Sequence, residues 1–343
     1  MDRRALNRAL LARQGLLERE RTPAFDLVHR LAGLQTQNPS AGHLALWSRI
    51  AGYDPAELDA LLLERRVVRT TLMRATKHLV TAADARAWRP LLEPALRRSV
   101  MGAFGRRLEG LDLDDVAAAA RAIGEPLTTT ELGRRLAERF DRRDPQALGI
   151  AAHLLVPCLQ PPPRGLWGRS GPALNVVFDA SPAEADPDEL VRRYLAAFGP
   201  ATVMDAQAWC GLTRLRESFE RLRSELLVIE ADDGRELFDL PDAPRPPADT
   251  PAPVRFLPVF DNVCLAYADR SRIVADAHRK TILARPWTDD GFVLVDGFAK
   301  ATWRVHRKGR KVERLEVTPF QDLEGVDVSA EAAAFEAFVR TSA

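Results

Sequence analysis

The 343-residue chain is poor in cysteine and has no long apolar segment. Its three cysteines, Cys158, Cys210 and Cys264, stand far apart in apolar surroundings. This argues against a disulfide framework or a zinc ribbon and indicates a reducing cytoplasm. No run approaches the roughly 20 uncharged apolar residues of a membrane-spanning helix, and the charged N-terminal stretch lacks the apolar core of a signal peptide. We therefore expect a cytoplasmic protein that does not bind a membrane.

The common signatures of catalysis are missing as well. The sequence contains no Walker A motif, no G-x-G-x-x-G after a strand, no G-x-S-x-G, no C-x-x-C pair and no H-E-x-x-H. Its six histidines are scattered without the spacing of metal ligands. These absences disfavour a metalloenzyme or a nucleotide hydrolase, and we expect neither a metal nor another cofactor.

The net charge of +1 conceals an uneven distribution. Residues 62–108 hold eleven Arg and Lys against three Asp and Glu, and residues 255–316 hold thirteen against eight. Residues 184–249 hold eight against fifteen. Only five of the 49 basic residues are Lys, which indicates a compositional bias, so the clustering is better evidence than the Arg content. Because a polyanion needs a local basic surface, the two basic segments favour nucleic acid as a partner.

Helical periodicity dominates the first two thirds of the chain. One helix is expected over residues 2–14, and a second from Thr22-Pro23 through Gln35-Thr36-Gln37 to Asn38-Pro39, because proline disfavours helical geometry in the residue before it. Asp54-Pro55 is expected to begin another helix, and Thr128-Thr129-Thr130-Glu131 is expected to begin a further one with a capping box. Three successive groups of helices each end in a predicted hairpin, which is typical of winged helices. A proline-rich linker at 241–253 leads to strands that are expected to form a small antiparallel sheet or barrel, and then to a final helix.

The predicted fold is therefore mainly α with β structure, in three tandem winged-helix units and a C-terminal β-barrel. We name these intervals the first unit (1–108), the second unit (109–182), the third unit (183–247) and the C-terminal region (252–343).

Two glutamines, Gln35 and Gln37, flank the apolar stripe of the predicted second helix. Residues two apart on a helix point away from each other, but unwinding at Asn38-Pro39 would turn both amides toward one cavity. An amide cannot act as a general base, although it can hold a water and stabilise a developing positive charge. On these residues alone, a capping network that holds the next helix is the preferred explanation, and catalysis is the alternative.

Four segments resemble the AlkZ-like DNA glycosylases, a winged-helix family first associated with azinomycin self-resistance. They read AGLQTQNPSAGHLALWSRI, RTTLMRATKHLVTAADA, LPVFDNVCLAYADRSRI and GFVLVDGFAKATWR, in the expected order over nearly the whole chain. The most specific element is the Gln-x-Gln motif, matched by Gln35 and Gln37; a sister branch carries Gln-x-Asp. The resemblance implies a DNA-binding cleft built from three winged helices and a β-barrel. It also implies excision of N7-alkylated guanines, including bulky genotoxin adducts and interstrand crosslinks.

With this resemblance, Gln35 and Gln37 become the candidate catalytic residues. We expect their carbonyl oxygens to bind the attacking water and the edge of the sugar. Other residues are candidate DNA contacts, because they lie on predicted hairpins or in the basic tail: Arg69, Arg74, Lys77, His78, Arg164, Trp167, Arg169, Arg270, Arg272, Arg279 and Lys280.

Several alternatives stay open for these contacts. The basic side chains of the first hairpin either bind phosphates or are only solvated. Trp167 either wedges into an opened duplex or is tucked onto its own domain. The HRKGRK stretch at 306–311 is expected to be an exposed basic turn. Asp261 is either a structural bridge to the barrel or a residue of the cleft.

The sequence thus predicts a monomeric, metal-free and monofunctional DNA glycosylase for cationic N7-alkylguanine lesions in double-stranded DNA. One alternative is a winged-helix transcriptional regulator without catalysis, normally a dimer on two half-sites. Another is a protein that sequesters the genotoxin itself. No heptad seam supports a dimer, and 7% aromatic residues spread along the chain give a sequestering pocket little support.

Overall fold

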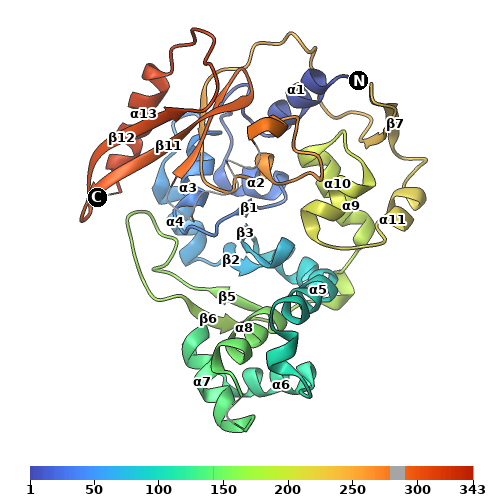
Figure 1. Ribbon diagram of the computed structural model, residues 1–343, viewed down its shortest axis with the longest axis vertical. Coiled ribbons are helices and arrows are strands. Elements are labelled where there is room, and N and C mark those ends of the chain that lie inside the picture. The colour runs from blue at the N-terminus through green and yellow to red at the C-terminus, as the bar shows by residue number, and fades with distance from the viewer. Residues whose placement is uncertain (142, 279–289, 343) are drawn as a thin grey trace.

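The structure is a computed structural model that describes residues 1–141, 143–278 and 290–342. In Figure 1 the second unit lies at one end of the molecule, and the third unit and the C-terminal sheet lie on opposite sides of the other end. Strands β1, β2 and β3 of the first unit lie between these parts. None of the helices in the described part of the chain combines the length and the apolarity needed to cross a bilayer.

The first unit contains the predicted helices and hairpin. Its elements are α1 (Arg3–Arg13), α2 (Ala24–Arg30), β1 (Leu34–Gln35), α3 (Ala41–Trp47), α4 (Pro55–Leu63), β2 (Val67–Thr71), the 3₁₀ turn η1 (Met73–Ala75), β3 (Lys77–Thr81), α5 (Ala82–Phe104) and η2 (Gly105–Leu108). Helix α4 begins as the sequence predicts, because the Asp54 carboxylate accepts a 2.9 Å hydrogen bond from the Ala56 N–H and proline occupies the first helical position.

The second helix is shorter than predicted, and the Gln-x-Gln motif is not helical. Helix α2 ends at Arg30, and Ala32 and Gly33 both have positive φ, 54° and 85°. At Gly33 a Cβ atom would lie 2.4 Å from Val80 Cγ1, so this turn requires glycine. The chain then pairs with β3, with Gln35 opposite His78. The prediction that a helix breaks at Asn38-Pro39 is therefore wrong.

The hairpins of the first and second units share one six-stranded sheet with the order β1-β3-β2-β5-β6-β4. The second unit contributes α6 (Leu113–Ile123), β4 (Leu127–Thr128), α7 (Thr129–Arg139), α8 (Pro145–Leu155), β5 (Cys158–Gln160) and β6 (Leu174–Val177). Thr128 and Glu131 form the predicted capping box of α7. Because β2 pairs with β3 on one edge and with β5 on the other, the first hairpin is interior to the sheet.

The third unit has the predicted order of three helices and a hairpin. After η3 (Pro182–Glu184) come α9 (Pro187–Phe198), α10 (Val203–Cys210), α11 (Arg216–Arg221), β7 (Leu227–Glu230) and β8 (Glu236–Asp239). The strands β7 and β8 form a separate two-stranded sheet. Each of the three predicted units thus contains helices followed by a hairpin, although β1 and the 23-residue helix α5 of the first unit were not predicted.

The described strands of the C-terminal region form an open sheet, which corrects the predicted barrel. The region contains β9 (Arg255–Leu257), η4 (Asn262–Cys264), β10 (Asp290–Val295), β11 (Phe298–Lys308), β12 (Lys311–Pro319) and α13 (Ser329–Arg340). Their antiparallel order is β12-β11-β10-β9, and β12 and β9 are its edges. Helix α13 covers one face, where Phe335 packs 5.1 Å from Phe256 and 4.8 Å from Trp303 between ring centroids. A helix thus buries a face that a barrel would bury by closure.

The apolar cores cross the predicted units. One core lies within residues 96–158. A second joins α2–α4 to the C-terminal sheet and α13, and a third joins α1, the first hairpin and α5 to the third unit. The first unit is therefore packed against every other part of the chain, and the predicted boundaries stay predictions.

A buried ion pair connects the first unit to the C-terminal region. Arg49 donates 2.9 and 2.8 Å hydrogen bonds to the two Asp261 carboxylate oxygens, and both side chains are almost fully buried. Asp261 also accepts from the Val263 N–H at the start of η4. Of the two roles considered for Asp261, the structure shows the bridge.

The substitution Asp261→Asn tests this bridge. Removing one charge of a buried pair leaves the other uncompensated, and we expect the free energy of unfolding to fall by about 3–5 kcal/mol. Chemical denaturation measures this loss. Glu236→Gln is the matched control, because its carboxylate pairs with Arg223 at the surface and its removal should change stability little. Equal losses in the two variants would show that the buried pair does not hold the fold together.

Candidate functional site

Gln35 and Gln37 lie at the end of β1, beside the hairpin β2–β3. Gln35 is the last residue of β1, and Gln37 lies in the bend that follows it. Gln35 is buried and its Oε1 accepts a 2.5 Å hydrogen bond from Arg74 Nη2. Gln37 is exposed and its Oε1 accepts a 3.2 Å bond from the Lys77 backbone N–H. Both amides are thus bound to the hairpin.

The hydrogen-bond donors fix the orientation of both amides. A guanidinium and a backbone N–H can only donate, so each Gln must turn its oxygen toward the hairpin. Neither Nε2 group donates a hydrogen bond to any described residue. Each carbonyl oxygen therefore keeps one lone pair available, and each amino group is available as a donor. These hydrogen bonds differ from the capping network that the sequence suggested, because both partners belong to the hairpin and not to the next helix.

Arg74 links Gln35 to the third unit. Arg74 and Ala75 have φ of 54° and 56°, a left-handed geometry that stores on the order of 1–2 kcal/mol per residue without glycine. The guanidinium also donates to the carbonyl of Trp209 at the end of α10. Burial, and then the charge of Arg270, lower the Arg74 pKa to about 10, so the group stays protonated at neutral pH. Arg74 thus holds Gln35 instead of extending from the hairpin toward a phosphate.

Arg69 holds the residue between the two glutamines. Its Nη2 donates a 2.7 Å bond to the Thr36 carbonyl, and its Nη1 donates a 2.9 Å bond to Gln160 Oε1 on β5. Gly165 lies so close that a Cβ there would be 2.8 Å from Arg69 Cδ. Only 2% of Arg69 is exposed, so the prediction of a phosphate contact is not supported.

Lys77 and His78 are also inside the protein. Lys77 Nζ donates to Thr71 Oγ1 at 2.7 Å and contacts His153 Nε2 at 2.8 Å, and burial lowers the Lys77 pKa to about 7. His78 Nδ1 donates to the Thr76 carbonyl at 3.0 Å, and burial lowers the His78 pKa to about 3. The imidazole is therefore neutral, with Nε2 as a buried acceptor that has no partner among the residues that the structure describes. For these two residues, too, burial argues against a phosphate contact.

The loop between β5 and β6 packs on the C-terminal helix. Trp167 stacks on Phe338 with 4.7 Å between ring centroids, and its Nε1 donates to Thr341 Oγ1 at 2.9 Å. The indole is neither free to act as a wedge nor tucked onto its own unit. Arg164 donates to the Gly171 carbonyl within the loop, whereas Arg169 is exposed.

The predicted contacts of the tail have different environments. Arg272 is buried, with its guanidinium 3.8 Å from the Tyr267 ring centroid and a 3.0 Å bond to the Pro200 carbonyl, so its role is structural. Arg270 is half-buried and lies near Arg74. Arg279 and Lys280 lie outside the described residues.

The sequence did not reveal Arg74 and Arg69 as supports of the motif, because each lies more than thirty residues away from it. Part of the rim of a neighbouring pocket, formed by Asn38 and Ser40, was also missed, although both residues directly follow the motif. In the described ranges, no group of three or more His, Cys, Asp or Glu side chains could hold a metal ion.

Comparison with known proteins identifies the family. The family model described as "DNA glycosylase AlkZ-like" matches residues 28–341. The interstrand DNA cross-link repair glycosylase of Streptomyces sahachiroi is 28% identical over 351 residues, covering 93% of this chain and 91% of the relative. The solved structure of Streptomyces sahachiroi DNA glycosylase AlkZ has the same fold, with a TM-score of 0.77 at 24% identity over 100% of this chain and 97% of that one. Because the family model covers most of the chain and includes both glutamines, this protein belongs to the AlkZ-like family of DNA glycosylases.

Proposed function

We propose that this glycosylase hydrolyses the N-glycosidic bond of cationic N7-alkylguanines in double-stranded DNA, including bulky genotoxin adducts and interstrand crosslinks. The observation that carries the proposal is the pair of neutral amides, Gln35 and Gln37, held by internal donors with no carboxylate bonded to either. The relative from Streptomyces sahachiroi, which is described as an interstrand cross-link repair enzyme, supports the substrate class.

The chemistry suits a positively charged base. Alkylation at N7 makes the guanine a good leaving group, so little general-acid help is needed, and the remaining task is to place a water against an oxocarbenium-like sugar. The free lone pair on each Oε1 accepts a hydrogen bond from this water, while each Nε2 donates to a sugar or phosphate oxygen, and the proton released when the water adds to the sugar passes to solvent. From the sequence, the two carbonyl oxygens alone were expected to bind both the water and the sugar edge. In this proposal the oxygens bind the water and the Nε2 groups bind the sugar, because Arg74 and the Lys77 N–H already use one lone pair on each oxygen.

The rest of the molecule acts in this proposal as a DNA clamp. The three helix–hairpin units act as winged helices that hold one damaged site, together with the C-terminal sheet. The enzyme acts as a monomer in the cytoplasm, and its repair of self-inflicted alkylation supplies resistance to a genotoxin.

The first test replaces both amides. In the double variant Gln35→Ala/Gln37→Ala, we expect release of N7-methylguanine from a duplex oligonucleotide to fall by about 100-fold or more, the loss typical of removing a transition-state hydrogen-bond partner. DNA affinity should stay within about twofold, because most of the binding comes from phosphate contacts. Gln146→Ala, at the exposed start of α8, is the matched control. Unchanged base release by the double variant would remove the assignment.

The second test changes the charge of the leaving base. Without a carboxylate, the site should release a neutral base such as hypoxanthine at least about 100-fold more slowly than N7-methylguanine, since each 1.4 kcal/mol of barrier is a factor of ten. Single-turnover assays with the two bases in the same duplex position measure this ratio. Similar rates would contradict a mechanism that depends on a cationic base.

The third test concerns Arg74 as the positioning residue of Gln35. Arg74→Ala should slow base release by about 10- to 100-fold, because a hydrogen bond to a charged group contributes about 1.5–3 kcal/mol. In a Gln35→Ala background the same substitution should cost little more, since its effect passes through that amide. Arg98→Ala is the control, because Arg98 donates to the nearby Gly211 carbonyl without touching the motif. Additive losses from Arg74→Ala and Gln35→Ala would show that Arg74 acts only on stability.

A further inference from the structure

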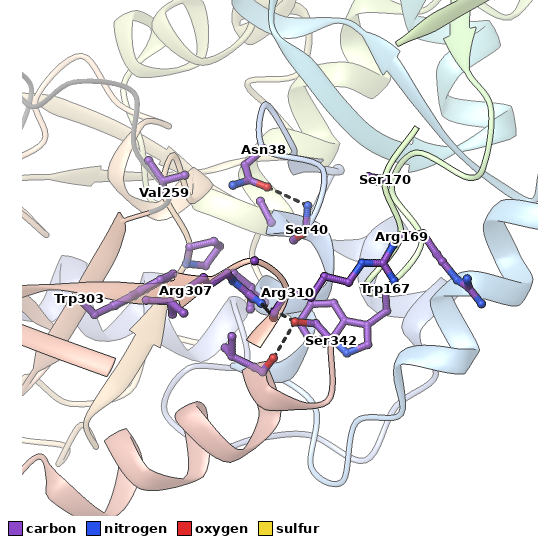
Figure 2. A pocket seen from close by; sticks show the side chains of 17 residues that line it. Asn38, Ser40, Trp167, Arg169, Ser170, Val259, Trp303, Arg307, Arg310 and Ser342 are labelled. Atoms are coloured by element: carbon purple, nitrogen blue, oxygen red, sulfur yellow. Dashed lines mark hydrogen bonds between the residues drawn. The ribbon is translucent and has the colours of Figure 1, made fainter. Parts of the chain in front are cut away.

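A pocket of about 320 Å³ lies beside the Gln-x-Gln motif. Figure 2 shows residues that line it, which come from the turn after β1, the β5–β6 loop, the segment after β9, the β11–β12 hairpin and the end of α13. Asn38 and Ser40, which follow Gln37 by one and three positions, form part of its rim. There the Asn38 side-chain oxygen accepts a 2.9 Å bond from the Ser40 N–H. The pocket is therefore joined to the proposed catalytic strand by a short, hydrogen-bonded turn.

The polar side of the pocket is positively charged. Three arginines line it, Arg169 from the loop and Arg307 and Arg310 from the hairpin, and its lining contains no Asp or Glu. Arg307 is held in place by 3.1 and 3.0 Å bonds to the Arg310 carbonyl and to Ser342 Oγ. The guanidiniums of Arg169 and Arg310 bind no partner among the described residues. Such uncompensated guanidiniums are suited to phosphate oxygens.

The opposite side of the pocket is apolar and rigid. Trp303 is buried, and its Nε1 donates to the Leu257 carbonyl at 2.8 Å, so its ring cannot rotate freely. Trp167 is fixed by its stacking on Phe338, and Leu44 and Val339 complete this surface. Because Trp303 and Val339 are almost fully buried and Phe338 covers one face of Trp167, this side offers ring edges and aliphatic carbons, against which one nucleobase can pack.

We propose that this pocket binds one nucleotide of the substrate DNA that has left the base stack. The phosphate contacts Arg169 and Arg310, and the base lies against the Trp167 and Trp303 side. This assignment rests on the proposed function, which supplies the DNA. The volume is at the small end of ligand pockets, about 300–1,000 Å³, and suits one nucleotide better than a longer strand.

The energetics of a damaged duplex support this proposal. Turning a nucleotide out of the stack costs a few kcal/mol, and the cost is least where pairing is already disturbed. A pocket that receives the displaced nucleotide offsets this cost beside the lesion. It thereby favours damaged over intact DNA before any bond is broken.

The test measures binding to undamaged DNA, so it does not depend on catalysis. Fluorescence anisotropy compares a fully paired duplex, a duplex with one bulged nucleotide, and the same bulge with the base removed. We expect the duplex with the intact bulge to bind about tenfold more tightly than the paired duplex, a gain comparable with the contribution of one stacked base. The duplex with the baseless bulge should have an intermediate affinity. Arg310→Gln and Arg169→Gln should each remove most of this preference while the melting temperature stays unchanged.

Lys308→Gln is the matched control. Lys308 lies on the same hairpin and carries the same charge, but it does not line the pocket. It should weaken binding to all three duplexes by a similar factor, as a general phosphate contact does. The proposal would be overturned if Arg310→Gln and Arg169→Gln lowered the affinity for all three duplexes by the same factor, as the control does.

Two further measurements distinguish DNA from a free nucleotide as the ligand, and failure of the pocket proposal from failure of the glycosylase mechanism. Free dGMP should compete only weakly for the bulged duplex; competition at the affinity of the bulge itself would assign the pocket to a free nucleotide and overturn the DNA assignment. Release of N7-methylguanine is measured in parallel. Intact bulge preference without base release would refute the glycosylase mechanism alone, whereas base release without bulge preference would refute the pocket alone.

Discussion

The hydrogen bond from Arg74 to Gln35 is the contact on which the geometry of the site depends. One guanidinium ties an amide of β1 to the end of α10, so the first and third units must be packed together before the amide is oriented. The bond lies in a poorly solvated region, where its electrostatic energy is larger than in water. A positive charge beside Oε1 also polarises the amide, which makes Nε2 a stronger donor and Oε1 a weaker base. The arrangement therefore fits a residue that binds and orients, and not one that removes a proton by itself.

Signals that act within one turn of helix could be predicted from the sequence. Asp54 and the Thr128–Glu131 capping box begin their helices at the expected residues, because each satisfies backbone N–H groups two or three positions away. The end of α2 was predicted wrongly for the opposite reason. The backbone after it is set by β3, which lies more than forty residues later in the chain, and by the space that Val80 leaves at Gly33. A motif could thus be found by its residue types while its secondary structure could not.

The basic hairpin shows a second limit of sequence patterns. Its charge balance favoured a wing exposed to DNA, but β2 has strands on both edges, and Arg69 and Lys77 are buried against Thr36, Gln160 and His153. A charge count does not reveal which strand edge is covered, because the covering strand β5 belongs to another unit. Arg169, Arg307 and Arg310 are exposed and line the pocket beside the motif. The sequence predicted Arg169 as a DNA contact and the other two as part of an exposed basic turn, so the pocket between them was not predicted.

In the proposed mechanism, Arg74 places a fixed positive charge near the reacting sugar, and the charge of the substrate decides how that charge affects the barrier. An N7-alkylated guanine carries one positive charge, which passes to the sugar as the bond breaks, while the departing base becomes neutral. Bond breaking therefore moves one positive charge a short distance and creates no new charge, so Arg74 raises the energy of the ground state and of the transition state by similar amounts and affects the barrier little. A neutral base would instead leave as an anion from a cationic sugar, and stabilising that separation near Arg74 would require a carboxylate. In the proposed mechanism, the two amides therefore favour a base that is already cationic, because they supply hydrogen bonds and no counter-charge.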